Sequence, residues 1–211
     1  MTFLPDKIEK LDTETVQVYI DRLYEYYLQE LKSDDFTYEG LFIYHKTQPA
    51  VDGKDGGFWH IVTKEYLDQN KRPITLPCIA KNGFPVCMHP CRLFQEYDPW
   101  RTVRITYPDG KTAPPRYLCL NRCERINWIK PIIKEAERNP DNLKIWDKKY
   151  SDNQINRHIW YERQSYLIVL GRWKNESKYN LLTSFATEYN DKKSQCQKEY
   201  QRYINNGNQP I

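Results

Sequence analysis

Apolar side chains near the N-terminus recur every three or four residues between residues 12 and 33. They are Val16, Ile20, Leu23, Tyr27, Leu28 and Leu31. This spacing places them along one face of an α-helix, and Asp12 or Thr13 can cap the first turn. The pattern therefore predicts an amphipathic helix over residues 12–33.

Short apolar runs separated by turn formers follow over residues 40–68. GLFIYH at 40–45 and FWHIVT at 58–63 are rich in β-branched and aromatic residues and predict strands. Between them, TQPAVDGKDGG at 47–57 has too many Pro and Gly residues for the interior of an element and predicts a loop. KEYLDQN at 64–70 predicts a short helical stretch.

Residues 70–118 are rich in proline and show little periodicity. The segment predicts a long irregular excursion, with short strands at 102–107. A connection of this length inside a compact domain either carries a function or contains elements that the pattern does not reveal.

A second amphipathic helix is predicted over Arg122–Arg138. Its apolar face consists of Ile126, Ile129, Ile133 and Ala136. The Asn139-Pro140 pair ends the helix. Pro131 lies inside it and is expected to kink the helix or shift its start.

Four strands are predicted after this helix, from their β-branched and aromatic content. They are Leu143–Trp146, Arg157–Tyr161, Tyr166–Leu170 and Tyr179–Ser184. Because only short connections separate them, they should pair antiparallel. A polar helix from Glu188 to Ile204 is expected on the outside. The sequence thus predicts an α+β fold, an antiparallel sheet packed against a helix. Residues 116–211 form this core, and residues 1–115 form an extension with a helix and long loops, packed into the same globule.

Composition narrows the class of protein. The 211 residues can bury a substantial core, and a mean hydropathy of −0.86 leaves no segment resembling a membrane span. MTFLPDKIEKLD lacks the features of a signal peptide. A cytoplasmic location, no membrane partner and reduced cysteines are therefore expected.

Charge is unevenly distributed along the chain. Residues 1–115 contain 14 Lys and Arg against 17 Asp and Glu, a net charge of −3, whereas residues 116–211 contain 18 against 11, a net charge of +7. A basic half is typical of proteins that bind a polyanion such as RNA.

Cleavage of RNA without a metal requires particular side chains. One group takes the proton of the 2′-OH, one protonates the leaving 5′-oxygen, and a cation stabilises the phosphorane. Histidine suits the proton transfers. His60, between Trp59 and Ile61, faces either a cleft or the edge of the core. His45 and Lys46, at a strand end beside the Gly-rich loop, suit phosphate contact or form an exposed pair.

Four segments resemble the phage-associated branch of the barnase–EndoU–colicin–RelE-like ribonuclease superfamily. RCERINWIKPII is similar to the helix of that branch, HIWYERQSYLIVLGRW to its hairpin, and YNLLTSF to its closing strand. GFWHIVT resembles the strand that carries a histidine towards the site. The resemblance implies a barnase- or RelE-like fold and a metal-independent endoribonuclease without a cofactor. It also implies a toxin or phage-related effector with an antitoxin or immunity protein as partner.

The resemblance also implies roles for individual residues. His60 would be the acid or base, Arg125 and Lys46 the cations that stabilise the phosphate, and Ser184 or Thr183 an orienting hydroxyl. His45 is a further catalytic candidate. The expected RNA-binding residues are Arg116, Arg122, Arg163 and Arg172.

Two other functions remain open. The basic half is also compatible with a nucleic-acid-binding protein that is not an enzyme. Thiolates and imidazole are ligands of structural zinc, which favours a zinc-stabilised protein-interaction domain. The candidate ligands are Cys78, Cys87, His89 and Cys91. No Cys-x-x-Cys pair is present, and Cys119 and Cys123 have the spacing of buried thiols on one helix face.

Overall fold

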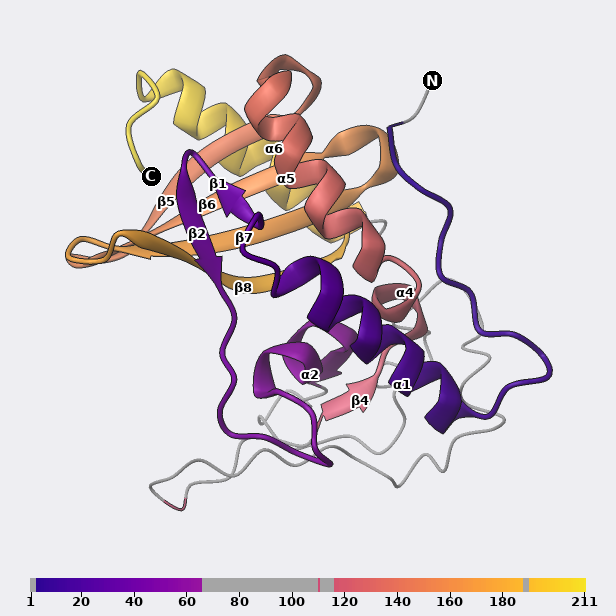
Figure 1. Ribbon diagram of the computed structural model, residues 1–211. Helices are drawn as coiled ribbons and strands as arrows, with labels where there is room; N and C mark the ends of the chain where they lie inside the picture. The colour runs from indigo at the N-terminus through magenta and orange to yellow at the C-terminus, as the bar shows by residue number, and fades with distance from the viewer. Residues whose placement is uncertain (1–2, 66–109, 111–115, 188–189) are drawn as a thin grey trace. The chain divides into compact units, whose positions relative to one another are not determined.

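The structure is a computed structural model that describes residues 3–65, 110, 116–187 and 190–211 (Figure 1). It has an α+β fold with a mixed six-stranded sheet, and the α+β class predicted from the sequence is confirmed. The described residues fall into two compact units. The first contains Met1–Asp6, Leu28–His45 and Asn127–Ile211, and the second contains Lys7–Tyr27 and Lys46–Ile126.

The first unit is built on the six-stranded sheet. Its strands are β1 (Thr37–Tyr38), β2 (Leu41–Tyr44), β5 (Lys144–Ser151), β6 (Gln154–Tyr161), β7 (Tyr166–Trp173) and β8 (Lys178–Ala186). Their order in space is β1-β2-β8-β7-β6-β5. The four strands predicted after residue 142 are present and pair antiparallel as expected. The predicted GLFIYH strand is β2, and it pairs parallel with β8. The sheet is therefore mixed rather than purely antiparallel.

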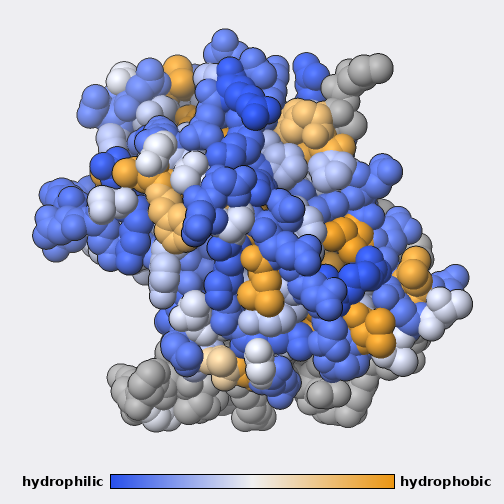
Figure 2. Space-filling view, in the orientation of Figure 1, coloured by the Kyte–Doolittle hydropathy of each residue, from blue (hydrophilic) through white to orange (hydrophobic). Residues whose placement is uncertain are grey.

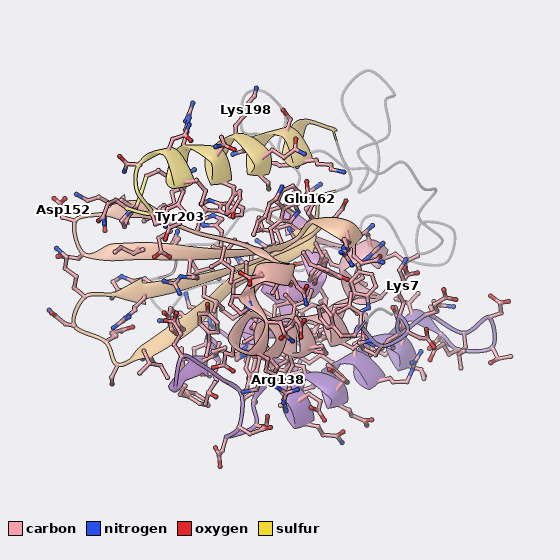
Figure 3. All side chains as sticks on the ribbon, turned by 90° about the horizontal axis from the view of Figure 1, so that it is seen from above. Lys7, Arg138, Asp152, Glu162, Lys198 and Tyr203 are labelled. Atoms are coloured by element: carbon pink, nitrogen blue, oxygen red, sulfur yellow. The ribbon has the colours of Figure 1, made fainter. Side chains whose placement is uncertain are left out.

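A helix covers each face of this sheet. Figure 3 shows Lys198 of α6 (Asn190–Asn205) on one side and Arg138 of α5 (Ile129–Arg138) on the other. On the α6 side, Trp146 and Trp160 pack with Cys196. Because strand residues alternate between faces, Ile159 points to the α5 side. Burial of both faces explains why β7 is an almost continuous apolar run.

The predicted helix Arg122–Arg138 is divided into three pieces. They are α4 (Leu120–Cys123), a 3-10 turn over Ile126–Trp128, and α5. Pro131 falls in the first turn of α5, where its missing N–H leaves no hydrogen bond unmade. This position explains the later start. The helix ends at Asn139-Pro140 as predicted, and its four predicted apolar residues are buried.

The first predicted helix is also present with changed ends. It is α1 (Val16–Tyr26), which continues as a π-helical turn over Tyr27–Leu31. The cap is Thr15, whose Oγ1 accepts from the Val18 N–H at 3.3 Å, so Asp12 and Thr13 were wrong. A π turn advances the apolar face by one residue, and Leu28 accordingly becomes exposed.

The second unit contains the clearest error of the sequence prediction. FWHIVT is not a strand but most of helix α2 (Gly56–Val62), followed by β3 (Thr63–Glu65). Phe58, Trp59, Ile61 and Val62 are all buried. This spacing fits the wide apolar face of a helix as well as it fits a strand. Strand β3 pairs antiparallel with β4 (Arg116–Leu118).

Two further expectations fall partly or wholly outside the described residues. Lys64 and Glu65, placed in a helical stretch, belong to β3, and the rest of KEYLDQN lies outside the described residues. The strands predicted at 102–107 also lie outside them. The compact units interleave in sequence, with Leu28–His45 in the unit of the six-stranded sheet. Within the described residues, no helix combines the length and apolar character needed to cross a bilayer.

Candidate functional site

His60 lies in the last turn of α2, at the surface of the second unit. It is exposed, while Trp59 and Ile61 on either side of it are buried. The helix therefore turns its apolar residues inward and leaves the imidazole outside. His60 is therefore accessible from solution, and a helix rather than the expected strand exposes it.

Two arginines hold the carboxyl end of α2. Arg116 donates from Nε to Thr63 Oγ1 at 2.8 Å. Arg122 donates from Nη1 to the carbonyl oxygens of His60 at 3.2 Å and Thr63 at 2.9 Å. The last carbonyls of a helix have no partner within the helix, and their partial negative charge attracts cations. Both guanidinium groups thus have a structural role, and they bring positive charge beside His60.

These surroundings change the titration of His60. The protein atoms packed around the ring disfavour its charged form, and the positive charges of Arg116, Arg122 and Lys46 add to this effect, so the pKa of His60 is lowered to about 4. The shift occurs although the residue as a whole remains exposed. At neutral pH the imidazole is uncharged, and one ring nitrogen can accept a proton.

Lys46 completes this group of polar residues. Its side chain is exposed, and its carbonyl oxygen accepts from the Gly57 N–H at 2.6 Å in the first turn of α2. The group formed by His60, Lys46, Arg116 and Arg122 is called the His60 cluster below. Four residues proposed from the sequence thus meet in one unit, although they come from three separate stretches of the chain.

The neighbouring His45 has different surroundings. It is only 4% exposed, and its ring lies 5.5 Å from that of Phe36 between centroids. Burial and then the charge of Lys32 lower the pKa of His45 to about 3. The exposed His-Lys pair considered from the sequence is therefore wrong for His45, which is a buried neutral residue. The Lys46 side chain is accessible from solution, whereas the His45 ring is enclosed.

Arg125 is also buried. It is 5% exposed and donates from Nη1 to the Asn121 carbonyl at 3.1 Å. It lies after α4 and before the 3-10 turn, rather than in the first turn of a continuous helix. The Arg125 guanidinium is therefore enclosed, whereas Arg122 is partly exposed and more accessible from solution.

The remaining candidates belong to the first unit. Thr183 and Ser184 pair with Val169 and Ile168 across β7 and β8 and so face opposite sides of the sheet, as expected. Ser184 is completely buried and Thr183 partly so. Arg163, in a 3-10 turn, is exposed. Arg172 is exposed near the end of β7.

Arg172 belongs to a cavity of about 230 Å³ in the first unit. The cavity, called the sheet-end groove below, is lined by Asp147, Ile155, Arg157, Arg172, Trp173, Lys174 and Tyr179. Apart from Arg172, none of these residues was expected in a site from the sequence. Alternation does put Ile155 and Arg157 on one face of β6, but their approach to Asp147 depends on the register of β5 with β6.

Metal binding has little support in the part of the chain that the structure describes. No group of three His, Cys, Asp or Glu side chains there is placed to hold a metal ion. The candidate ligands Cys78, Cys87, His89 and Cys91 lie outside the described residues. Cys119 and Cys123 are buried, as their spacing indicated.

The surface of the first unit is predominantly polar on one side. Figure 2 shows that the side carrying β1 and β2 is mostly hydrophilic, with apolar residues in small separate patches. Phe42 on β2 is 39% exposed. A surface of this kind suits a polar or charged partner better than a broad apolar one.

Comparison with known proteins does not add a function. No protein family, curated protein or solved structure matches this chain. What the protein does must therefore be inferred from its own residues, chiefly the His60 cluster and the sheet-end groove.

Proposed function

We propose that this protein is a metal-independent endoribonuclease that uses the 2′-OH of its substrate as the nucleophile. The observation that carries the proposal is the His60 cluster, an exposed neutral imidazole surrounded by Lys46, Arg116 and Arg122. These are the groups that metal-free cleavage needs, a proton acceptor beside cations that attract a phosphate.

In the proposed reaction, a neutral ring nitrogen of His60 takes the proton from the 2′-OH. The 2′-oxygen forms a bond to phosphorus, and the bond from phosphorus to the 5′-oxygen breaks. Because a pKa near 4 makes the imidazolium a strong acid, the same ring can return the proton to the leaving oxygen. The products are a 2′,3′-cyclic phosphate and a free 5′-OH.

The cations of the cluster would have different tasks. Lys46 is exposed and Arg122 partly so, which lets both contact the phosphate. Arg116 is 4% exposed and acts through its charge on His60. Arg125, Ser184 and His45 are enclosed, so in this proposal they support the fold rather than touch the substrate.

The proposal includes a biological setting based on the sequence resemblance. An RNA substrate, a role as a toxin or phage-related effector, and control by an antitoxin or immunity protein follow from that resemblance. The cytoplasmic location in this proposal follows from the composition and the N-terminal sequence. Growth arrest on expression of the wild type, relieved by His60→Asn, would support this setting.

The direct test is incubation of the purified chain with a mixed RNA pool in EDTA. Cleavage that leaves 2′,3′-cyclic phosphate ends is expected. His60→Asn should lower the rate by about 10²–10⁴-fold, since it removes the proton acceptor but keeps a polar side chain of similar size. Lys198→Ala, which removes an exposed cation of α6, is the control and should keep the wild-type rate.

Each contrary result points elsewhere. If a correctly folded His60→Asn variant kept full activity, the ribonuclease activity would stand, but His60 would not be its catalytic residue. Intact RNA with salt-dependent binding would indicate a nucleic-acid-binding protein that is not an enzyme. Intact RNA without binding, together with stoichiometric zinc, would indicate the zinc-stabilised interaction domain.

A further inference from the structure

The sheet-end groove contains cations of two kinds. Arg157 is fully engaged, since it donates to both Asp147 oxygens at 2.6 and 2.9 Å and also to Glu39. Arg172 and Lys174 are exposed. Within the part of the chain that the structure describes, neither of them forms an ion pair with a carboxylate. The groove therefore presents two available positive charges, those of Arg172 and Lys174, above a floor fixed by the Arg157–Asp147 pair.

A network of hydrogen bonds from the turn between β1 and β2 holds this floor in place. Glu39 accepts from Arg157 and, at 2.6 Å, from the Tyr179 hydroxyl. The Glu39 N–H donates to Glu137 Oε1 of α5 at 2.7 Å. The Arg172 guanidinium lies 5.8 Å from the centroid of the Tyr179 ring, within the range of a cation–π contact. Arg172 is thus held near the groove without losing its charge.

The chemistry of the lining selects the ligand class. The carboxylate of the lining, Asp147, is already paired with Arg157, so a ligand cation would meet no available anion. An anion would meet Arg172 and Lys174 beside the apolar side chain of Ile155. A guanidinium matches two phosphate oxygens, and an ammonium adds a point charge.

The size of the groove limits the ligand further. At about 230 Å³ it is smaller than the roughly 300–1,000 Å³ of pockets for drug-sized ligands. A single phosphate with part of its nucleotide fits this volume better than a large cofactor. We propose that the sheet-end groove binds a nucleotide phosphate of single-stranded RNA through Arg172 and Lys174. The choice of RNA rests on the proposed ribonuclease function, whereas the phosphate chemistry rests on the groove alone.

The test measures binding with an RNA that cannot be cleaved. A fluorescein-labelled 2′-O-methyl hexauridylate has no free 2′-OH, and its fluorescence anisotropy reports affinity at several salt concentrations. Arg172→Ala/Lys174→Ala should weaken binding at least tenfold. It should also reduce the slope of log K against log salt by about 0.7 for each phosphate that the variant no longer neutralises.

The matched control is Lys198→Ala/Arg202→Ala. It removes two exposed cations from α6 in the same unit and so makes the same change in net charge. Binding within twofold of wild type is expected for this control. Equal weakening in both variants would mean that only net charge matters, and wild-type binding by Arg172→Ala/Lys174→Ala would mean that the groove holds no phosphate. Either result would overturn the proposal.

Competition distinguishes the sources of phosphate. Uridine monophosphate and inorganic phosphate should displace the hexanucleotide only at far higher concentrations. If either binds the wild type as tightly as the hexanucleotide, and the groove variant loses that binding, the phosphate site stands and its ligand is a free phosphate compound instead of RNA.

The outcome is separable from that for the ribonuclease. Loss of binding in the groove variant together with a wild type that cleaves no RNA would keep the groove and reject the enzyme. Unchanged binding in the groove variant together with RNA cleavage by the wild type would support the enzyme and reject the groove as a phosphate site.

Discussion

Arg157 and Asp147 face each other across β5 and β6 and share two parallel hydrogen bonds, from Nε to Oδ1 at 2.6 Å and from Nη2 to Oδ2 at 2.9 Å. Their side chains are only 22% and 15% exposed. A bidentate pair in such a place fixes the geometry of both side chains. It keeps the floor of the sheet-end groove rigid. It also neutralises the Asp147 carboxylate, which would otherwise repel an anionic ligand.

Loss of this pair should lower stability. Asp147→Asn leaves a half-buried guanidinium with a weaker partner, and we expect the free energy of unfolding to fall by about 2 kcal/mol. Urea denaturation measures the change. Asp152→Asn breaks a pair with Lys149 in which Asp152 is 91% exposed. This exposed pair is screened by water, so its loss should leave the free energy of unfolding almost unchanged. Equal effects in the two variants would show that the enclosed pair contributes no more than a surface pair.

The charge around His60 should be visible in its titration. Packing and the nearby cations lower the pKa of His60 to about 4. Arg122→Gln removes one of those charges but keeps an N–H donor for the carbonyls at the end of α2. We therefore expect the pKa of His60 to rise towards 6.5. NMR titration of the ring protons measures it, with His60→Asn to assign the signal. An unchanged pKa would mean that the charge of Arg122 does not contribute to the shift.

The same shift predicts how cleavage depends on pH. The base form of His60 is present above its pKa of about 4 and is lost as the pH falls through that value. The kcat/KM for RNA should thus be flat from pH 5 to 7 and drop below pH 4.5. In Arg122→Gln the drop should move to higher pH. A rate that follows a group titrating near 6.5 in the wild type would assign the proton transfer to another residue.

Buried His45 should make the fold sensitive to acid. Burial and Lys32 lower the pKa of His45 to about 3, whereas an unfolded chain has the ordinary value of about 6.5. Between these values the unfolded state binds the proton and the folded state does not, so stability is lost as the pH falls from 6.5 towards 3. One pKa unit corresponds to about 1.4 kcal/mol, which gives a loss of at most about 3 kcal/mol by pH 4.

His45→Gln tests this source of acid sensitivity. Glutamine does not titrate, so the free energy of unfolding should vary less between pH 7 and pH 4 than in the wild type. The comparison uses the change with pH within each protein, because the substitution also changes packing at a buried position. Equal pH dependence in the two proteins would show that His45 is not the responsible group.

Close packing at the start of α2 should make replacement of Gly57 by alanine destabilising. A Cβ at Gly57 would lie 2.8 Å from the backbone oxygen of Lys46, which cannot move aside as a side chain can. Alanine usually favours a helix over glycine by about 1 kcal/mol, but here the clash should outweigh that gain. We expect Gly57→Ala to lower stability by about 1–3 kcal/mol in thermal unfolding. Val18→Ala, at an exposed position of α1, is the control. A gain in stability for Gly57→Ala would contradict the packing of α2 on Lys46.

The sequence by itself determined those elements whose signals are local. A high content of β-branched and aromatic residues predicted β5 to β8, and Asn139-Pro140 marked the end of α5. These signals act through the conformational preferences of neighbouring residues, so the elements can be predicted from the sequence without knowledge of the fold. FWHIVT lacked such a signal, because its apolar residues suit a helix and a strand equally. Contacts of Phe58 with Tyr24 and Tyr27, at 5.0 and 5.6 Å between ring centroids, accompany the helical choice.

The two sites depended on relationships that only the tertiary structure decides. The chemistry of His60, Arg116 and Arg122 was predictable from residue type. Their meeting at the end of α2 required residues more than fifty positions apart to come together. In the sheet-end groove, Arg172 was a candidate, but the pairing of Arg157 with Asp147 and Glu39 depends on strand register and on a turn 118 residues away. Side-chain identity sets what a group can do, whereas its pKa, access and partners follow from which distant segments pack around it.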